Sequence, residues 1–341
     1  MQKTKPIRVL IVDDSMISRE VIKKGLTADP GIMVVGTAAD PYEAVEMIEK
    51  TSPDVLTLDV NMPRMDGITF LKKLMQQHPM PVVVISGSEH SVLKALETGA
   101  VDFVKKPDIK TPEDLKAFLE EIVYVIKVAT VSKTKPLCKT PVAVEKVIKS
   151  PNKKEIELIA MGASTGGTDA LMRILKEFPT TAPGVVIVQH MPPTFTRMYA
   201  ERLDSLCEIE VMEAKTGVSI LPGRALIAPG GLQMKVLKNG SGYKVKCYSG
   251  EKVSGHCPSV DVLFESVADT VGKKAMGVIL TGMGSDGAKG LLNMKKAGAY
   301  TIGQDQKSSV VYGMPMVAYN IGAVEKQLPL EEIARHIFRS L

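Results

Sequence analysis

Residues 158–175, LIAMGASTGGTDALMRIL, contain the pattern that decides the fold. Four apolar residues, 158–161, stop at Gly162, and small or hydroxylic residues follow around Ser164. Apolar residues return at positions 171, 172, 174 and 175, a spacing that suits one face of a helix. The stretch therefore predicts a strand, a tight turn and a helix, which can either cradle a phosphate or present a nucleophile.

Alternating strand and helix patterns extend from this stretch in both directions. Toward the N-terminus, five apolar runs each precede a helical pattern: IRVLIV (7–12), IMVVGTA (32–38), DVLTLD (54–59), PVVVIS (81–86) and DFVK (102–105). Toward the C-terminus come the runs GVVIVQH (184–190), RALIAP (224–229), AMGVILTG (275–282) and YTIGQD (300–305). Repeated strand–helix pairs predict parallel sheets covered on both faces. One exception is a predicted hairpin from Met234 to Cys247, turning at KNGSG, because Asn-Gly favours a tight turn.

A length of 341 residues suits two domains rather than one. Residues 130–154 hold seven lysines against one glutamate, with prolines at 136, 141 and 151, and this composition is typical of an extended linker. We therefore predict an α/β domain over residues 1–127, a linker over 128–154, and a larger, doubly wound α/β domain over 155–341.

The composition argues against several classes of protein. The net charge is +5, but the linker accounts for +6 of it, and the chain has no Trp, so nucleic-acid binding is not indicated. Neither a membrane-spanning segment nor a secretory leader is expected. The cysteines at 138, 207, 247 and 257 have no C-x-x-C spacing, so we expect no zinc site or disulfide framework and a cytoplasmic location.

Polar residues follow the predicted strands of the first domain. Asp13 and Asp14 end the first strand, Asp59 the third and Ser86 the fourth, while the fifth runs into Lys106. Ligands of open parallel sheets gather beyond the carboxyl ends of the strands. Three carboxylates at one edge repel each other, so they imply a divalent cation such as Mg²⁺. Together with the Ser86 hydroxyl and the Lys106 amine, these carboxylates predict a phosphoryl site in which Asp59 is the nucleophile.

VDDS, LDVNMPRMDG, VVVISG and FVKKP, in this order over residues 7–127, resemble the motifs of the response-regulator receiver family. The resemblance implies a flavodoxin-like sheet with strand order 2-1-3-4-5 and phosphorylation of Asp59 by a partner histidine kinase. It also implies that Asp13, Asp14, Asp59 and the backbone of Asn61 surround Mg²⁺. Ser86 and Lys106 would support the phosphoryl group, and Phe103 would be an aromatic switch.

The turn after residue 161 does not fit a nucleotide-binding loop. A dinucleotide loop needs glycine where Ser164 stands, and a Walker loop needs a lysine that is missing here. Gly162, Ser164 and Gly166 instead fit G-x-S-x-G, the nucleophile elbow between a strand and a helix. A serine nucleophile needs a base and an orienting acid.

His190 and Asp286 each stand at or just beyond the carboxyl end of a predicted buried strand, and we predict them to be the base and the acid. His256 is an alternative base in a loop setting, whereas His336 lies on a polar C-terminal helix. A helix-capping role is the alternative for Asp286, and the two roles are compatible.

The longer motifs resemble those of the chemotaxis protein-glutamate methylesterase family. They are IAMGASTGG, VQHMPPTFT, EAKTGVSILPGRALIAPGG, HCPSVDVLF, GVILTGMGSDGAKG and SSVVYGMP. The resemblance implies catalytic roles for Ser164, His190 and Asp286, and places Thr165 and Met283 at the oxyanion. The family commonly has a histidine where this chain has Gln233, which puts substrate contacts of that loop in doubt.

The resemblance implies a phosphorylation-activated serine esterase that removes γ-methyl esters from glutamates of methyl-accepting chemotaxis receptors and deamidates receptor glutamines. Its partners would be a chemotaxis histidine kinase and those receptors, so the protein would be peripheral to membrane receptor arrays without being inserted. Apart from Mg²⁺ in the receiver, no cofactor is expected. We also hypothesise that the unphosphorylated receiver masks the esterase. The alternative is a non-enzymatic phospho-switch whose second domain only binds a partner.

Overall fold

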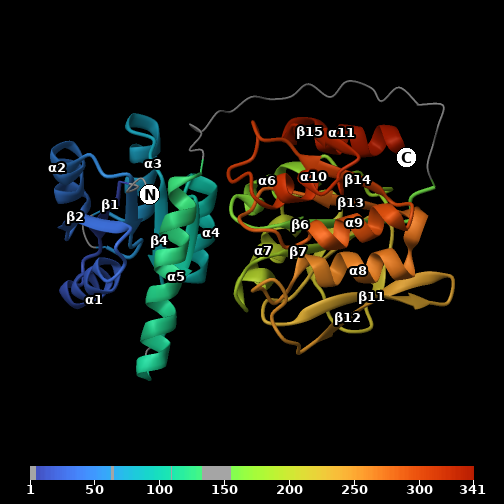
Figure 1. The fold of residues 1–341 in the computed structure, drawn as a ribbon, viewed down its shortest axis with the longest axis horizontal. Helices are drawn as coiled ribbons and strands as arrows, with labels where there is room; N and C mark the ends of the chain where they lie inside the picture. The colour runs from blue at the N-terminus through green and yellow to red at the C-terminus, as the bar shows by residue number, and fades with distance from the viewer. Residues whose placement is uncertain (1–4, 63–64, 109, 133–154) are drawn as a thin grey trace. The chain divides into compact units, whose positions relative to one another are not determined.

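The computed structural model describes residues 5–62, 65–108, 110–132 and 155–341. The chain divides into two compact units, residues 1–141 and 142–341, and each is described by itself (Figure 1). The predicted linker lies outside the described residues from position 133 onward. Its first three residues, 128–130, are helical, since α5 (Pro112–Thr130) continues past the expected boundary.

The first unit is a five-stranded parallel sheet in the order β2-β1-β3-β4-β5, as predicted. The strands are β1 (Ile7–Val12), β2 (Ile32–Ala38), β3 (Val55–Leu58), β4 (Val82–Ser86) and β5 (Asp102–Lys105). The helices that alternate with them are α1 (Met16–Thr27), α2 (Pro41–Thr51), α3 (Gly67–Gln77), α4 (Glu89–Thr98) and α5.

Side-chain caps fix where most of these helices begin. The side chains of Ser15, Asp40 and Asp66 accept backbone N–H groups of the first turns of α1, α2 and α3. Thr111 and Asp114 form a capping box on α5. Each cap lies in the loop between a strand and the helix that follows it, so it fixes the far end of that loop.

The second unit contains a seven-stranded sheet in the order β15-β14-β13-β6-β7-β10-β8, and every neighbouring pair is parallel. Its strands are β6 (Leu158–Ala163), β7 (Gly184–Gln189), β8 (Glu210–Glu213), β10 (Arg224–Ile227), β13 (Ala275–Ile279), β14 (Tyr300–Gln304) and β15 (Lys326–Leu328). The helices are α6 (Gly167–Leu175), α7 (Phe195–Asp204), α8 (Val260–Thr270), η1 (Gly272–Lys274), α9 (Ala288–Lys296), α10 (Met314–Asn320) and α11 (Leu330–Ser340).

The two central strands bury side chains on both faces. Leu158 and Ala160 of β6 belong to a core cluster with residues of α8 and α9, such as Phe264 and Leu291. Ile159 and the other intervening residues of β6 are equally buried but outside that cluster. Since successive side chains of a strand point to opposite faces, both faces are covered, as a doubly wound fold requires.

A separate three-stranded sheet, ordered β11-β12-β9, contains the predicted hairpin. Its strands are β11 (Gln233–Asn239), β12 (Gly242–Tyr248) and β9 (Ser219–Ile220), all antiparallel. The turn lies within the predicted KNGSG: Asn239 pairs with Gly242, and the two-residue loop is Gly240-Ser241, with Gly240 at a φ of 59°. Gly supplies the left-handed backbone at the first loop position.

In the part of the chain that the structure describes, no helix combines the length and the apolar character that crossing a membrane would require.

Candidate active site and phosphoacceptor site

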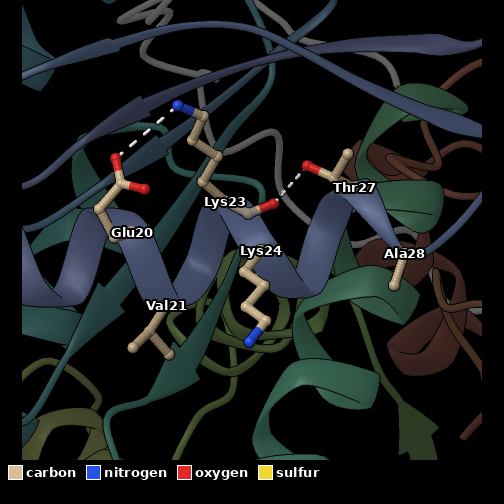
Figure 2. Close-up of a pocket in the computed structure, with 6 residues that line it drawn as sticks. All are labelled: Glu20, Val21, Lys23, Lys24, Thr27 and Ala28. Carbon is tan, nitrogen blue, oxygen red and sulfur yellow. Dashed lines mark hydrogen bonds and ion pairs between the residues drawn. The ribbon is translucent and has the colours of Figure 1, made fainter.

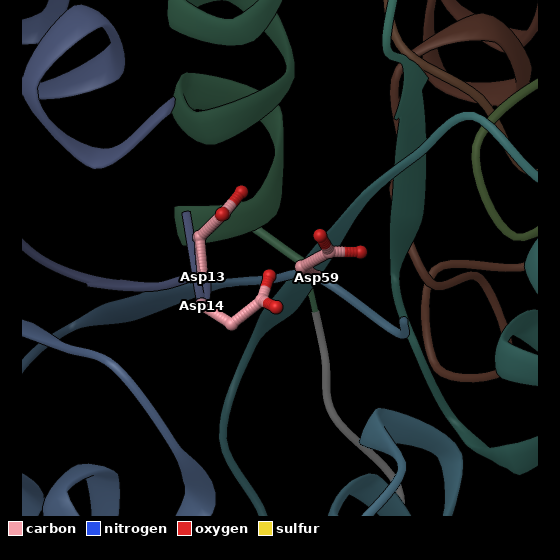
Figure 3. Close-up of side chains that lie close together, drawn as sticks. All are labelled: Asp13, Asp14 and Asp59. Carbon is pink, nitrogen blue, oxygen red and sulfur yellow. The ribbon is translucent and has the colours of Figure 1, made fainter. Parts of the chain in front are cut away.

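Three carboxylates meet at the carboxyl edge of the receiver sheet. Asp13 and Asp14 follow β1, Asp59 follows β3, and one ligand oxygen from each lies within 4.8 Å of the others (Figure 3). Asp13 and Asp59 are buried and Asp14 is exposed, so the cluster is open on one side. Like charges this close repel unless a cation lies between them.

Lys106, after β5, supplies one such cation. Its Nζ donates to Oδ2 of Asp13 at 2.7 Å and also to Oδ2 of Asp59. Burial works to lower the pKa of Lys106, but the hydrogen bonds and charges of the two aspartates outweigh it and the pKa is raised. The lysine therefore stays charged beside the predicted phosphoacceptor.

Of the remaining predicted residues, Asn61 contacts Asp59 directly, and Ser86 and Phe103 are buried side chains at the ends of or within neighbouring strands. The backbone N–H of Asn61 donates to Oδ1 of Asp59 at 3.0 Å, and Ser86, fully buried, receives the N–H of Ser88 at 3.1 Å. Phe103 is also buried, at 8% exposure. Gly67 is required here, because a Cβ at this position would stand 2.4 Å from the Asp59 carbonyl oxygen.

The donor set of this site fits Mg²⁺. Three carboxylates offer oxygen atoms within 4.8 Å of one another, and oxygen is the ligand that Mg²⁺ prefers. A different hollow, of about 630 Å³, lies along α1 and is lined by Glu20, Val21, Lys23, Lys24, Thr27 and Ala28 (Figure 2). None of the residues that line this hollow was predicted to belong to a site.

In the second unit, three adjacent strands bring the predicted triad residues to one edge. The strand order places β6 between β13 and β7, and Ser164, His190 and Asp286 lie in the segments that follow them. Ala163 pairs with Gln189, and the N–H of His190 donates to the Ala163 carbonyl at 3.1 Å. Ser164 and His190 thus each follow one member of a paired couple of residues, on neighbouring strands about 4.8 Å apart.

His190 and Asp286 are in direct contact. Nε2 of His190 lies 2.8 Å from Oδ2 of Asp286, and their side chains are only 8% and 1% exposed. Asp286 also accepts the Ser259 hydroxyl at 2.7 Å and the N–H groups of Val260 and Asp261 at 2.7 and 3.0 Å. Burial raises the pKa of Asp286, but the bonds from His190, Asp261 and Ser259 prevail, and the pKa is below its ordinary value.

Asp286 therefore does cap a helix, but not the one that follows it in sequence. The helix that follows, α9, begins after Gly287, whereas the N–H groups on Asp286 belong to the first turn of α8. The positive end of the α8 dipole favours the carboxylate form.

Ser164 occupies a cramped turn beside the predicted oxyanion residues. Its N–H donates to the Thr281 carbonyl at 3.0 Å, and a Cβ on Gly282 would lie 2.7 Å from the Ser164 Cβ. Met283 follows Gly282 directly, and Thr165, next to the serine, is 7% exposed with its carbonyl bound by the Thr281 hydroxyl. Thr165 therefore adjoins the serine in sequence, and Met283 follows a residue that packs against the serine.

Among the described residues, no hydrogen bond joins the Ser164 hydroxyl to His190. Nδ1 of His190 is buried and has no hydrogen-bond partner, while Nε2 is taken by Asp286. If Nε2 carries the proton that Asp286 accepts, Nδ1 carries the lone pair. It is the ring atom left to accept a proton from the serine.

Gln189, which the sequence analysis did not single out, joins the two segments. Its Nε2 donates to the carbonyls of Ser164 and His190, at 3.0 and 3.3 Å. The amide is 3% exposed, and a Cβ on Gly167 would lie 2.2 Å from its Oε1. Its place in VQH, one residue before the base, was the available signal.

The other two histidines of this unit have different surroundings. The ring of His256 stacks on His190 with centroids 3.7 Å apart and planes 8° from parallel, so it belongs to the site although it does not contact Asp286 through a hydrogen bond. His336 lies on α11, and its Nε2 is 2.8 Å from the Tyr300 hydroxyl.

Gln233, which replaces the histidine common in the family, is buried. It is 2% exposed, its Nε2 donates to the Glu251 carbonyl at 2.9 Å, and its Oε1 accepts the Ser259 N–H at 2.9 Å. It braces the segment that carries His256 and the partners of Asp286.

Two family models match this chain, one in each unit. Residues 159–337 match the family model described as CheB methylesterase, and residues 9–120 match the response regulator receiver domain. A protein-glutamate methylesterase/protein-glutamine glutaminase of Syntrophomonas wolfei is 52% identical over 335 residues, 98% of this chain and 97% of its own. The protein of the same name from Salmonella typhimurium is 47% identical over 341 residues, with the same coverage. Among solved structures, the Thermotoga maritima CheB methylesterase catalytic domain aligns with a TM-score of 0.53 at 34% identity, covering 55% of this chain and 99% of that one.

Proposed function

Because the chain belongs to the CheB methylesterase family and carries a receiver domain, we propose that it is a phosphorylation-regulated protein-glutamate methylesterase and protein-glutamine glutaminase with a Ser164–His190–Asp286 triad. The single observation that supports the triad best is the 2.8 Å contact between His190 and the deeply buried Asp286, one strand on either side of the serine turn. A carboxylate that only capped α8 would not require a hydrogen bond to a histidine.

The residues divide the work of acyl transfer between them. Nδ1 of His190 accepts the Ser164 proton as the oxygen attacks the γ-carbonyl of a methylated glutamate. Asp286 fixes the ring and stabilises its cation, and the backbone at Thr165 and Met283 receives the oxyanion. His190 returns the proton to departing methanol, then activates water against the acyl-enzyme. A glutamine reacts by the same route and releases ammonia.

The absence of a hydrogen bond from Ser164 to His190 does not conflict with this mechanism. Catalytic hydrogen bonds are often loose in free enzymes and tighten around bound substrate. The proposed mechanism requires that the Ser164 hydroxyl come within hydrogen-bonding distance of Nδ1 when substrate is bound.

In the receiver domain, we propose that Asp13, Asp14, Asp59 and the Asn61 backbone would hold Mg²⁺, and that the ion, when bound, would supply charge neutralisation for a phosphoryl group. Asp59 is the acceptor, Lys106 pairs with the phosphoryl oxygens and Ser86 donates to them. Phe103 is the aromatic switch whose side chain responds to phosphorylation of Asp59. The donor is a chemotaxis histidine kinase and the substrates are methyl-accepting receptors, which makes the protein a cytoplasmic component peripheral to receptor arrays.

Methanol release from methylated receptor membranes tests the activity and its control together. The full chain is compared with Ser164→Ala, with and without a phosphodonor. We expect the variant to lose at least about 10⁴-fold in rate, and the phosphodonor to accelerate only the parent. Ser205→Ala, the same change at an exposed serine that ends α7, is the control and should match the parent. Equal rates for the parent and Ser164→Ala would favour the phospho-switch that only binds a partner.

A further inference from the structure

The ring of His256 lies flat against the face of His190. The centroids are 3.7 Å apart and the planes differ by 8°, so the two imidazoles are nearly superposed. Two neutral aromatic rings prefer an offset or edge-on arrangement, because the faces of both carry negative charge density. A cation over the face of a neutral aromatic ring is attractive, most strongly where water is excluded. The stack therefore suits the moment when His190 carries the extra proton.

His256 itself stays neutral in this setting. Burial and the neighbouring His190 lower its pKa to about 4, against an opposing effect of Asp286, and Lys252 also lowers it. A neutral ring does not repel the His190 cation at ordinary pH.

The backbone around His256 is held rigidly. Val253 and His256 exchange two backbone hydrogen bonds, of 3.0 and 2.9 Å, across a tight turn through Ser254 and Gly255, which both have positive φ. The Gly231 N–H donates to the Cys257 carbonyl at 3.1 Å.

Gln233 anchors the same segment from β11. Its amide reaches the carbonyls of Glu251 and, at 3.4 Å, His256, and it accepts the Ser259 N–H. One buried side chain thus ties the ring that covers His190 to the segment that binds Asp286.

We propose, on the basis of the proposed esterase function, that His256 is a positioning residue: its ring fixes the plane of His190 so that Nδ1 faces Ser164, and it stabilises the His190 cation through its face. Asp286 holds one edge of the base by a hydrogen bond, but a single bond leaves the ring free to tilt about it. The stacked ring removes that freedom.

Replacement of the ring by a small side chain and by a non-titrating aromatic one tests this role in the full chain. We expect His256→Ala to lower kcat by about ten- to thirty-fold with KM changed by less than about two-fold. His256→Phe keeps an aromatic face and should recover most of the rate. His78→Ala, at an exposed histidine of the receiver, is the matched control.

NMR supplies a readout that does not depend on activity. The carbon-bound ring protons of His190 should be displaced by the ring current of residue 256 in the parent and in His256→Phe, and should move in His256→Ala. Unchanged kcat in His256→Ala, or a His256→Phe variant as slow as His256→Ala, would overturn the proposal. Absence of methanol release by the parent would instead refute the esterase function, while the NMR comparison still tests the stack.

Discussion

Gln189 has the clearest untested role among the single residues of the site. It donates one hydrogen bond to each of the segments that carry the nucleophile and the base. The opposite orientation of its amide would place Oε1 against two carbonyl oxygens, so the donors must face them.

Gln189→Leu should therefore lower both stability and rate. Two buried carbonyls lose a donor, at a cost of about 1–3 kcal/mol in the free energy of unfolding, and kcat should fall about ten-fold as the serine turn and the base drift apart. Denaturant unfolding and methanol release measure the two effects. Gln76→Leu, the same change at an exposed position of α3, should stay within about 0.5 kcal/mol. A fully active Gln189→Leu would show that strand pairing alone positions the two residues.

Asp286 makes the stability of the second unit depend on acid. Because its pKa is lower in the folded chain than its ordinary value of 3.8, its contribution is complete above that value and is lost as the pH falls through the folded pKa. Asp286→Asn should be less stable than the parent at pH 7, and the difference should shrink as the pH is lowered below about 4. Unfolding free energies of the parent and the variant at several pH values test this. A constant difference would mean that Asp286 titrates identically in the folded and unfolded chains.

At this scale the sequence marked the residues that we propose to react, but not the residues that support them. Ser164, His190 and Asp286 stand out because each follows an apolar run. The partners of Asp286 lie about 25 residues away in sequence, on the first turn of α8, and nothing local marks them. Gln233 was noticed only as a departure from a pattern, and its buried role depends on a segment that pairs with it through space.

Among the elements, α3 begins in close backbone contact with the loop that carries Asp59. The first residue of the helix, Gly67, donates its N–H to the Val60 carbonyl at 3.0 Å, and an added Cβ would stand 2.6 Å from the Cα of Val60. The contact is with backbone, which cannot give way as a flexible side chain could.

Gly67→Ala should therefore displace the loop that carries Asp59. We expect a loss of about 1–3 kcal/mol in the unfolding free energy of the receiver unit and slower phosphorylation from a small phosphodonor. Gly87→Ala is the stability control, since a Cβ there meets nothing within 4 Å. If both variants unfold alike, α3 can shift without strain.

The elements found from sequence are those with long apolar runs. All five receiver strands and the central strands of the larger sheet were predicted, because buried parallel strands read as continuous apolar stretches. Three short strands, β8, β9 and β15, were missed. Their sequences, EVME, SI and KQL, contain no extended apolar run, and each strand pairs with a neighbour that folding alone brings near.

At the scale of the whole molecule, each unit has its own sheet and core, so each should fold alone. Residues 155–341, expressed separately, should unfold cooperatively and release methanol from methylated receptor membranes without a phosphodonor. If the unphosphorylated receiver masks the esterase, this fragment should be faster than the unphosphorylated full chain. A fragment that folds but is no faster would rule out masking and leave activation to another route.

The exposed loop between β11 and β12 is a site where an insertion should not disturb the fold or the serine turn. Gly240, in its two-residue loop, has a positive φ and no neighbour within 4 Å of a built Cβ, and the loop is exposed. The serine turn follows the carboxyl end of β6 in a different sheet. A fluorescent reporter spliced between Gly240 and Ser241 should leave turnover intact and should make the enzyme visible in living cells without altering either terminus.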